Sequence, residues 1–436
     1  ILGVNVDGLD DDSQRSLLIS ALDNVSKDKV DTPTKIDTIN GIVGKILNAA
    51  GNATKANQLA ITDFTGVGVN ELEGADDGIL QNMRDAVAAL NKNDIDSVAE
   101  LKVLADGLLR DLKAIRDYAT GVVTLPPTVA NYANARINGV TSDNLDSINA
   151  AIRVLGSNEI TVSQVRTPAN LQKVVAAYNR VLLAADNGTT AVAPSLTRDD
   201  LTSIGVQISE KPGEANADRN AAALKLLLTT LELQPADKST VKTPALINEL
   251  AELSGKIADY ADGLASATAP NTADLTKLQV KSILAENGAT PSTEGLIQDM
   301  LKSFKNSGEH ALASLDLTVL QNMAHVAYKL RDLTSTSGTI AEDQRPDAGA
   351  RDAAGNPLHG ARLTLDELKL LGLDVADASA ERIKLLNDAI DVQNSFETVS
   401  TLAKLKALKL DDIVKRVMQQ ADAGEPDPAH PARLLP

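Results

Sequence analysis

The side chains with the clearest potential for metal chemistry form one acidic cluster close to the start of the chain. Residues 7–13 read DGLDDDS, and several carboxylates in one loop suit a hard cation such as Ca²⁺. The spacing differs from the D-x-[DN]-x-[DN]-G…E calcium loop, and Asp or Ser directly before a helix is ordinary N-capping. We therefore expect no cofactor, with calcium at the Asp7–Asp12 loop as the weaker alternative.

Other residue types that carry chemistry are too sparse or wrongly spaced to form a site. Cysteine is absent, which excludes disulfides and thiol catalysis. Gly66-Val67-Gly68 and Gly41-Ile42-Val43-Gly44-Lys45 hold fragments of nucleotide-binding motifs without the remaining residues, and no G-x-S-x-G elbow occurs. The histidines lack zinc-site spacing; they are His310, His325, His359 and His430. The sequence predicts no catalytic, cofactor-binding or metal-binding residue, and a protein that is not an enzyme.

The aromatic residues bear on sugar binding, because glycan sites usually present aromatic platforms. Aromatics make up only 2% of the chain, and no Trp occurs. The tyrosines fall at helix positions, where a ring packs in the core while the hydroxyl reaches a polar partner; they are Tyr118, Tyr132, Tyr178, Tyr260 and Tyr328. We expect core or junction residues, with a glycan platform at a junction as the alternative.

Length and composition limit the class of protein. A chain of 436 residues implies several domains. Hydrophobic residues at 43% and charged residues at 23% indicate folded structure, and the scarcity of aromatics favours slim helical bundles. The net charge of −17 argues against nucleic acid or anionic lipid as a partner. No apolar run reaches the roughly 20 residues of a membrane span.

A short helix that ends in an aliphatic-Gly-aliphatic signature recurs along the chain. A left-handed Gly can end a helix while the next apolar residue folds back. The copies are Leu2-Gly3-Val4, Ile204-Gly205-Val206 and Leu371-Gly372-Leu373, with looser versions at Thr65-Gly66-Val67 and Ile137-Asn138-Gly139-Val140. Capping boxes at Thr197–Asp200 and Thr364–Glu367 predict where two of them begin. In the fifth copy we expect Leu275–Leu284 as the short helix, and Gly139 is predicted to end the third.

Two further amphipathic helices follow each short one. The middle helices are predicted from apolar residues at helical spacing, at 16–25, 79–90, 145–155, 220–231, 296–304 and 383–392. The long helices carry a heptad seam, clearest from Leu246 to Leu264 and repeated at 36–50 and 171–185. Three of them begin at Thr-Pro, where Thr caps and Pro suits the first turn; these are Thr32-Pro33, Thr167-Pro168 and Thr243-Pro244.

Stretches rich in Gly, Pro and small polar residues mark the boundaries between copies. We predict an all-α tandem array of small three-helix modules that forms an elongated rod or superhelix, since small modules gain stability by packing on their neighbours. The boundaries are 1–55 (N-terminally incomplete), 56–127, 128–195, 196–271, 272–361 with a loop insertion, and 362–424, followed by a Pro-rich tail at 425–436. The chain begins ILGVNVDG, without Met or signal peptide, so we expect a section of something longer.

Several motifs resemble the acidic helical tandem repeats of giant bacterial surface proteins, the biofilm-associated and RTX-type adhesins. They are NGVTSDNLDSINAAI, LTRDDLTSIGV, LTLDELKLLGLDV and TPANLQKVVAAYNRVLLAA. The resemblance implies a secreted or surface-anchored protein whose repeats hold a terminal adhesive domain away from the cell. The glycine-rich calcium repeats of RTX regions are absent from this sequence, so calcium-dependent folding is not carried over.

The sequence leaves three functions open. The first is a non-enzymatic extender region of a large bacterial adhesin or filament, at the extracellular cell surface. The second is a self-assembling surface-layer or filament subunit, and the third is a protein-binding helical scaffold. The expected partners are neighbouring modules of the same chain, and other copies or other surface proteins, with no nucleic acid and no membrane span.

Overall fold

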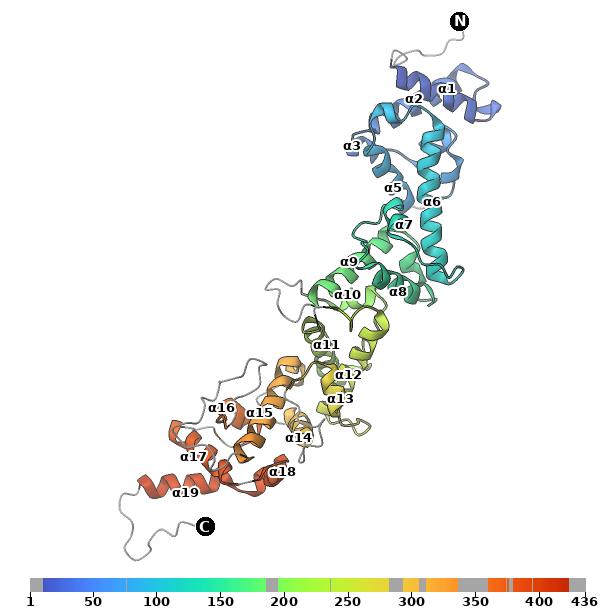
Figure 1. The fold of residues 1–436 in the computed structure, drawn as a ribbon. Coiled ribbons are helices and arrows are strands. Elements are labelled where there is room, and N and C mark those ends of the chain that lie inside the picture. The colour runs from blue at the N-terminus through green and yellow to red at the C-terminus, as the bar shows by residue number, and fades with distance from the viewer. Residues whose placement is uncertain are drawn as a thin grey trace, which may run out of the picture. The chain divides into compact units, whose positions relative to one another are not determined.

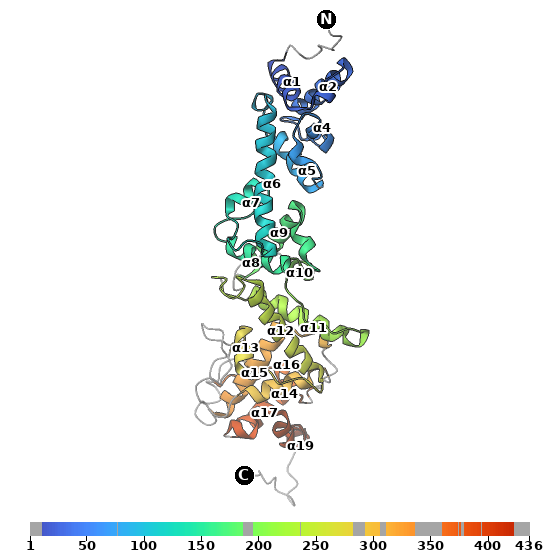
Figure 2. The ribbon, with the colours of Figure 1, turned by 90° about the vertical axis from the view of Figure 1, so that its right-hand side faces the viewer.

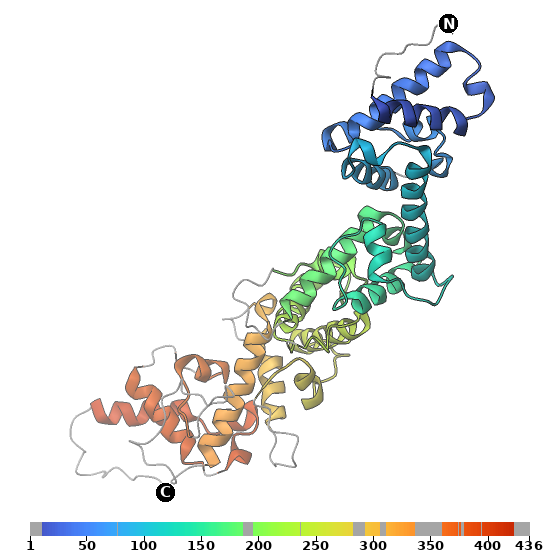
Figure 3. The ribbon, with the colours of Figure 1, turned by 45° about the horizontal axis from the view of Figure 1, so that its top comes forward.

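The computed structural model describes residues 11–75, 77–185, 195–235, 237–281, 293–305, 311–335, 360–373, 375, 379–393 and 395–422. All regular structure in these ranges is helical, as Figure 3 shows, which confirms the all-α class. Within the same ranges, none of the helices combines the length and the apolar character that a bilayer crossing requires.

The first of two compact units comprises residues 1–184, 192–206 and 238–246. In this unit α1 lies beside α2, and α6 packs along α7 and α8 (Figures 1 and 2). Short 3-10 turns connect several of the helices. The helices are α1 (Asp12–Asn24), α2 (Pro33–Ala49), α3 (Ala53–Ala56), α4 (Ile61–Gly66), α5 (Asp77–Ala88), α6 (Val98–Thr120), α7 (Val129–Asn134), α8 (Leu145–Gly156), α9 (Pro168–Ala184) and α10 (Arg198–Ser203).

The second unit comprises residues 185–191, 207–237 and 247–436. Within it α15 packs against α14 and α17, and α19 packs against α17. Its described helices are α11 (Ala217–Glu232), α12 (Pro244–Asp262, in this unit from Ile247), α13 (Thr272–Lys277), α14 (Glu294–Phe304), α15 (Leu317–Ser335), α16 (Leu365–Leu370), α17 (Ala380–Asp391), α18 (Leu402–Ala407) and α19 (Leu410–Asp422).

The predicted middle and long helices are confirmed. The middle helices are α1, α5, α8, α11, α14 and α17, each within a few residues of its expected bounds. Thr32 caps α2 by accepting from the Lys35 amide, with Pro33 in the first turn, and Thr167 and Thr243 accept from the third amide of α9 and α12. Two long helices, α6 and α15, begin at Ser97 and Asp316 instead, which cap in the same way. Aliphatic side chains fill the cores, as the composition predicts.

The short helices are α4, α7, α10, α13 and α16, each six residues long. The fifth-copy expectation of Leu275–Leu284 is wrong, because the helix is α13, which Asn271 and Asp274 cap. The assignment of Gly139 as a helix end is also wrong, because α7 ends at Asn134 and Arg136 takes the left-handed conformation, with φ 58°. Leu2-Gly3-Val4 lies outside the described residues.

Candidate functional site

The five short helices share one type of hydrogen bonding at each end, complete in four of them at the start. At the start of α10, Asp200 N–H donates to Thr197 Oγ1 (3.2 Å) and Thr197 N–H donates back to Asp200 Oδ2 (3.0 Å). This capping box recurs at Thr128–Asn131, Asn271–Asp274 and Thr364–Glu367. In α4 the capping residue is Ala60, which has no side-chain acceptor, so only Ala60 N–H to Asp63 Oδ2 forms (2.8 Å). Each box satisfies amides that a helix start leaves unpaired.

Each short helix ends in a Schellman motif. The backbone N–H of the residue nine positions after the capping residue donates to the carbonyl of the residue four positions after that same cap. The residue eight positions after the cap has a positive φ. The long-range bonds are Val69 to Phe64 (3.0 Å), Ile137 to Tyr132 (2.9 Å), Val206 to Leu201 (3.0 Å), Val280 to Leu275 (3.0 Å) and Leu373 to Leu368 (3.2 Å). The left-handed residues are Gly68, Arg136, Gly205, Gln279 and Gly372.

A base on the preceding long helix binds the acid at the third position of the short helix. Arg180 Nε on α9 donates to Asp200 Oδ1 (2.8 Å), and Lys256 on α12 pairs with Asp274 of α13 (2.5 Å). The other pairs are Lys45–Asp63 (3.2 Å) and Lys329–Glu367 (2.6 Å). We call this repeated contact the base–acid latch. One carboxylate oxygen caps the short helix while the carboxylate also joins that helix to its predecessor.

The latch bases stand at one position of the long helices. Each lies thirteen residues after the residue that caps its helix, as the pairs Thr32 and Lys45, Thr167 and Arg180, Thr243 and Lys256, and Asp316 and Lys329 show. In α6 that position holds Arg110, which pairs with the neighbouring Asp111. Asp111 accepts from Asn131 Nδ2 (2.9 Å) and Asn134 Nδ2 (2.7 Å) of α7. At the α6–α7 junction a carboxylate on the long helix therefore accepts from amide side chains of the short helix, in place of the base–acid latch.

The pKa values of Asp111, Asp200 and Asp274 are lowered by these contacts. Burial alone would raise the pKa of Asp200, but hydrogen bonds from Arg180 and Thr197 outweigh it and hold that pKa below its usual value. Asp274 behaves in the same way. Burial alone would raise its pKa, but hydrogen bonds from Lys256 and Asn271 outweigh burial and lower it. For Asp111, burial is opposed by hydrogen bonds from Arg110, Asn134 and Asn131, and the pKa is again lowered. The acids are stabilised in the charged form that the latch needs.

Two further contacts recur around the short helices. An amide side chain five residues into a long helix bonds the backbone just after a short helix: Asn138 N–H donates to Gln172 Oε1, Gln207 N–H to Asn248 Oδ1, and Lys281 N–H to Gln321 Oε1, all at 2.7 Å. Middle-helix side chains donate to the carbonyl before the cap, in the pairs Arg84–Leu59, Asn149–Pro127, Gln298–Pro270 and Asn387–Leu363. Each short helix is thus fixed by polar contacts from other helices as well as by its apolar residues.

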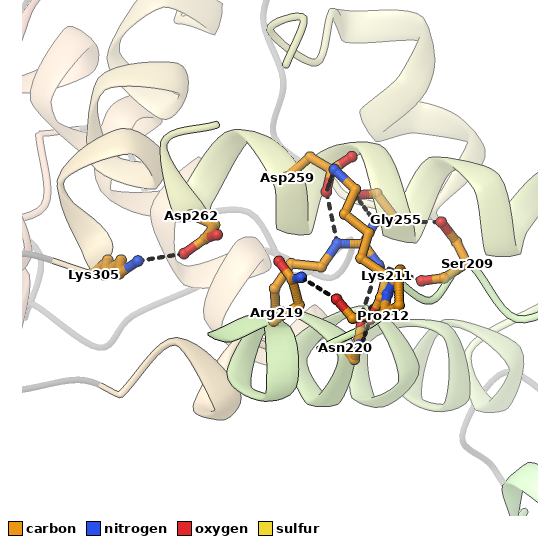
Figure 4. Close-up of polar contacts among 10 residues, drawn as sticks. Ser209, Lys211, Pro212, Arg219, Asn220, Gly255, Asp259, Asp262 and Lys305 are labelled. Carbon is orange, nitrogen blue, oxygen red and sulfur yellow. Dashed lines mark hydrogen bonds and ion pairs between the residues drawn. The ribbon is translucent and has the colours of Figure 1, made fainter. Parts of the chain in front are cut away.

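A second polar cluster surrounds Arg219, whose side chain on α11 is 1% exposed (Figure 4). Arg219 Nε donates to Asp259 Oδ1 on α12 (2.6 Å), and Nη2 donates to the Gly255 carbonyl (3.0 Å). Nη1 donates to the carbonyl of Ser209, in the loop before α11. Lys211 from the same loop also pairs with Asp259 (2.9 Å), so burial is outweighed and the pKa of Asp259 is lowered. The guanidinium joins α11, α12 and this loop, which is a structural role.

Two shallow hollows lie beside latch bases. One, of about 150 Å³, is lined by Lys45, Asn48, Lys55, Gln58 and Leu59. The other, of about 220 Å³, is lined by Ser209, Glu252, Lys256, Asp259, Ser266, Ala267 and Thr268. The side chains that line them differ in charge, and the bases and Asp259 are already held in the ion pairs described above.

The candidate residues from the sequence are placed as follows. Asp11 caps α1 by accepting from the Ser13 and Gln14 amides, as N-capping predicts, while residues 7–10 lie outside the described part. Of the histidines only His325 is described; it is buried on α15, 2.9 Å from Gln321 Nε2. Among the described residues no cluster of three or more His, Asp or Glu is arranged to hold a metal.

Two of the tyrosines are core residues, and the glycines differ in how closely other helices approach them. Tyr132 and Tyr178 are fully buried, burial raises the pKa of both, and their hydroxyls donate to Asn149 Oδ1 (2.7 Å) and the Val241 carbonyl (2.9 Å). In α2, a Cβ at Gly41 would meet nothing within 4 Å, and one at Gly44 would lie 3.8 Å from Gln14 Nε2. Close approaches occur at Gly156, against the Ala119 backbone, and at Gly255, against Ser209.

The latch bases were not predicted. A single Lys or Arg in a long amphipathic helix has the appearance of an ordinary solvated residue, and its meaning depends on an acid 18 to 38 residues further on. The constant distance from the N-cap is the signal that could have revealed them. Comparisons of the chain with protein-family models, with curated proteins and with solved structures found no match.

Proposed function

We propose that the chain is a tandem array of three-helix modules that acts as a non-enzymatic extender region of a large bacterial surface adhesin. Each module consists of a short, a middle and a long helix, and the base–acid latch joins four of the long helices to the short helix of the next module. The observation that carries the proposal is the recurrence of this latch at constant positions. A contact that recurs at each junction is what an array of similar modules needs, and a catalytic site does not require it.

The sequence around the first two modules supports a tandem array. With a shift of 65 positions and no gap, Gly3-Val4-Asn5 aligns with Gly68-Val69-Asn70, and the cap Thr32 aligns with the cap Ser97. The same shift aligns Lys45 with Arg110, the residues at the latch position. Residues that set the ends of helices and the junction contact therefore keep their spacing over a whole module.

The chemistry of the latch suits an extender. In Lys329–Glu367 the ammonium side chain is 2% exposed, and in Arg180–Asp200 the carboxylate side chain is 4% exposed. Buried partners are screened by salt much less than surface ion pairs, so such a junction keeps its strength as ionic strength changes outside a cell. The net charge of −17 also disfavours collapse of the chain onto itself or onto other copies.

The test is a duplication of one module within the full chain. A second copy of residues 196–271 inserted after residue 271 keeps the α12–α13 junction and adds one between α12 and the inserted α10, in which Lys256 can pair with Asp200. We expect small-angle scattering to show a monomer whose maximum dimension increases by one module length. The control carries Asp200→Lys in the inserted copy, which repels the latch base and should broaden the distribution of lengths. A particle that stays compact would contradict the extender function, and polymers would favour the self-assembling subunit.

A further inference from the structure

The residues around each latch base form a short apolar strip on which the short helix rests. The strip consists of the residue three positions before the base, the base itself, and the residue one position after it. The strips are Ile42, Lys45 and Ile46; Ala177, Arg180 and Val181; Leu253, Lys256 and Ile257; and Val326, Lys329 and Leu330. A Cβ placed at Gly66 of α4 would lie 2.8 Å from Ile42 Cδ1, so the short helix contacts the strip directly.

Where a short helix covers the strip, the residue after the base is fully buried. Ile46, Val181, Ile257 and Leu330 are each 0% exposed. A second stripe, two and six residues before the base, is also buried and faces other helices of the same unit. For α2 these residues are Val43 and Ile39.

Helix α19 carries the same residue types at the strip positions, with Ile413, Arg416 and Val417. Because α19 begins at Leu410, Arg416 lies closer to the start of its helix than the latch bases do. Its inner stripe is buried, since Val414 and Leu410, two and six residues before Arg416, are each 2% exposed. The strip itself is not covered: Ile413 is 47% and Val417 is 44% exposed. Arg416 is exposed and forms no ion pair with any residue that the structure describes. We call Ile413, Arg416 and Val417 the α19 face.

We propose that the α19 face binds a short capped helix of the same type as α4, α10, α13 and α16, carried by a further helical module. This inference rests on the proposed function as an array of modules. The four covered strips identify the occupant, because each combines two flanking apolar residues with a base that takes the acid at the third helical position. The proposal assigns Ile413 and Val417 to apolar contact and Arg416 to the carboxylate.

Residues 423–436 do not encode such an occupant. They lie outside the described part of the chain, and their sequence, AGEPDPAHPARLLP, has four prolines and no Thr or Asn followed three residues later by Asp or Glu. The occupant therefore requires a sequence of the kind found at Thr197–Gln207, which supplies the cap, the acid and the apolar residues.

Disulfide trapping in an extended chain tests the proposal. Residues 187–271 are appended after Pro436, which leaves the full chain intact. The tether from Arg416 to the appended cap is then 31 residues, between the 17 of Arg180–Thr197 and the 35 of Lys329–Thr364. Ile413→Cys is combined with Ser203→Cys in the appended copy, because these positions correspond to the contacting Ile42 and Gly66. The chain has no other Cys.

We expect this pair to form a disulfide at least tenfold faster than the control pair Gln419→Cys with the same appended Cys, since residue 419 lies on another side of α19. Arg416→Glu should slow trapping, and adding Asp200→Lys in the appended copy should restore it, which a purely structural role of Arg416 would not produce. Equal trapping rates at positions 413 and 419 would overturn the proposal. The scattering test of the proposed function concerns internal junctions only, so the two can fail separately.

Discussion

Arg180 on α9 and Asp200 on α10 stand in the same relationship as Lys256 on α12 and Asp274 on α13. In both pairs the base lies thirteen residues after the threonine that caps the long helix, and the acid lies three residues after the cap of the short helix. Each acid also accepts the backbone amide of that cap. One carboxylate therefore stabilises the start of a helix and its attachment to another helix, so the two effects should be lost together.

Replacing the latch residues tests that dual role. Asp200→Ala should lower the free energy of opening of α10 by about 2–4 kcal/mol, because it removes a cap and a buried ion-pair partner. Arg180→Ala should lower the free energy of opening of α10 by less, because the Arg180 guanidinium is partly exposed and the Asp200 cap remains. In a double-mutant cycle the coupling energy should be about 1–2 kcal/mol. Hydrogen exchange of the α10 amides measures these values.

The exposed pair Lys277–Glu249 is the matched control for that cycle. Its Nζ–Oε2 distance is 3.3 Å, and its side chains are 60% and 56% exposed. Its coupling energy should be below about 0.5 kcal/mol, as is usual for solvated ion pairs. Equal coupling energies for the two pairs would show that burial of the acid does not strengthen the latch.

Stability should fall at acidic pH because four carboxylates, two of them latch acids, have lowered pKa values. Asp111, Asp200, Asp259 and Asp274 all titrate below the ordinary 3.8 in the folded chain. The unfolded chain therefore binds more protons near pH 3.8, so their contribution is complete above that value and is lost as the pH falls through the folded pKa values. Melting temperature should change little between pH 7 and about pH 5 from this source and fall steeply below about pH 4.

Asp200→Asn identifies the share of one acid in this pH dependence. Asn at the third position occurs naturally at Asn131 and keeps the capping bonds, but it does not titrate. The variant should be less stable at neutral pH and should show a shallower loss of stability below pH 4. An unchanged slope would mean that Asp200 does not contribute to the acid transition.

Much of the fold could be predicted from the sequence because its signals are local. The six middle helices follow from apolar periodicity, and Thr197–Asp200 and Thr364–Glu367 follow from capping chemistry. The ends of α7 and α13 could not be predicted from glycine, because Arg136 and Gln279 take the left-handed conformation. The Schellman hydrogen bonds and the packing of Ile137 and Val280 outweigh a cost of about 1–2 kcal/mol. The latch could not be predicted because it joins residues whose spacing varies with the intervening loop.

Arg219 should be among the residues least tolerant of substitution. Arg219→Ala would leave the half-buried Asp259 with only Lys211 and would remove the donor to the Ser209 and Gly255 carbonyls. We expect a loss of about 3–5 kcal/mol in urea unfolding followed by circular dichroism. Arg219→Lys should recover little, because one ammonium cannot replace the planar fork. As the control, Lys211→Ala should cost less than about 1 kcal/mol, and a similar cost for both variants would contradict the role assigned to Arg219.

Gly139 should still be sensitive to substitution, although it does not end a helix. Its φ is 87°, and a Cβ there would lie 3.1 Å from Asn179 Nδ2, whose amide donates to the Gly139 carbonyl (2.9 Å). Gly139→Val should lower the stability of the first unit by about 1–3 kcal/mol, because a β-branched residue is strained at positive φ. Gly74→Ala, at φ 76° with nothing within 4 Å, separates the cost of φ from that of crowding. Equal losses in thermal unfolding would assign the effect to φ alone.

The left-handed residue eight positions after the cap should prefer glycine in both α10 and α13. Replacing glycine there should destabilise α10, and introducing glycine should stabilise α13. Gly205 has φ 86°, and its Cβ would lie 2.8 Å from Val154 Cγ1, so Gly205→Ala adds strain and a clash. Gln279 has φ 67° and already bears the cost of a side chain in the left-handed region. Gln279→Gly should therefore stabilise α13 by about 0.5–1 kcal/mol, net of the greater freedom of Gly in the unfolded chain. Hydrogen exchange of the Val280 amide, which closes the Schellman motif onto Leu275, should slow in this variant and accelerate for the equivalent Val206 amide in Gly205→Ala. Faster exchange at Val280 in Gln279→Gly would contradict this prediction. It would mean that the side-chain contacts of Gln279 stabilise the turn by more than its positive φ destabilises it.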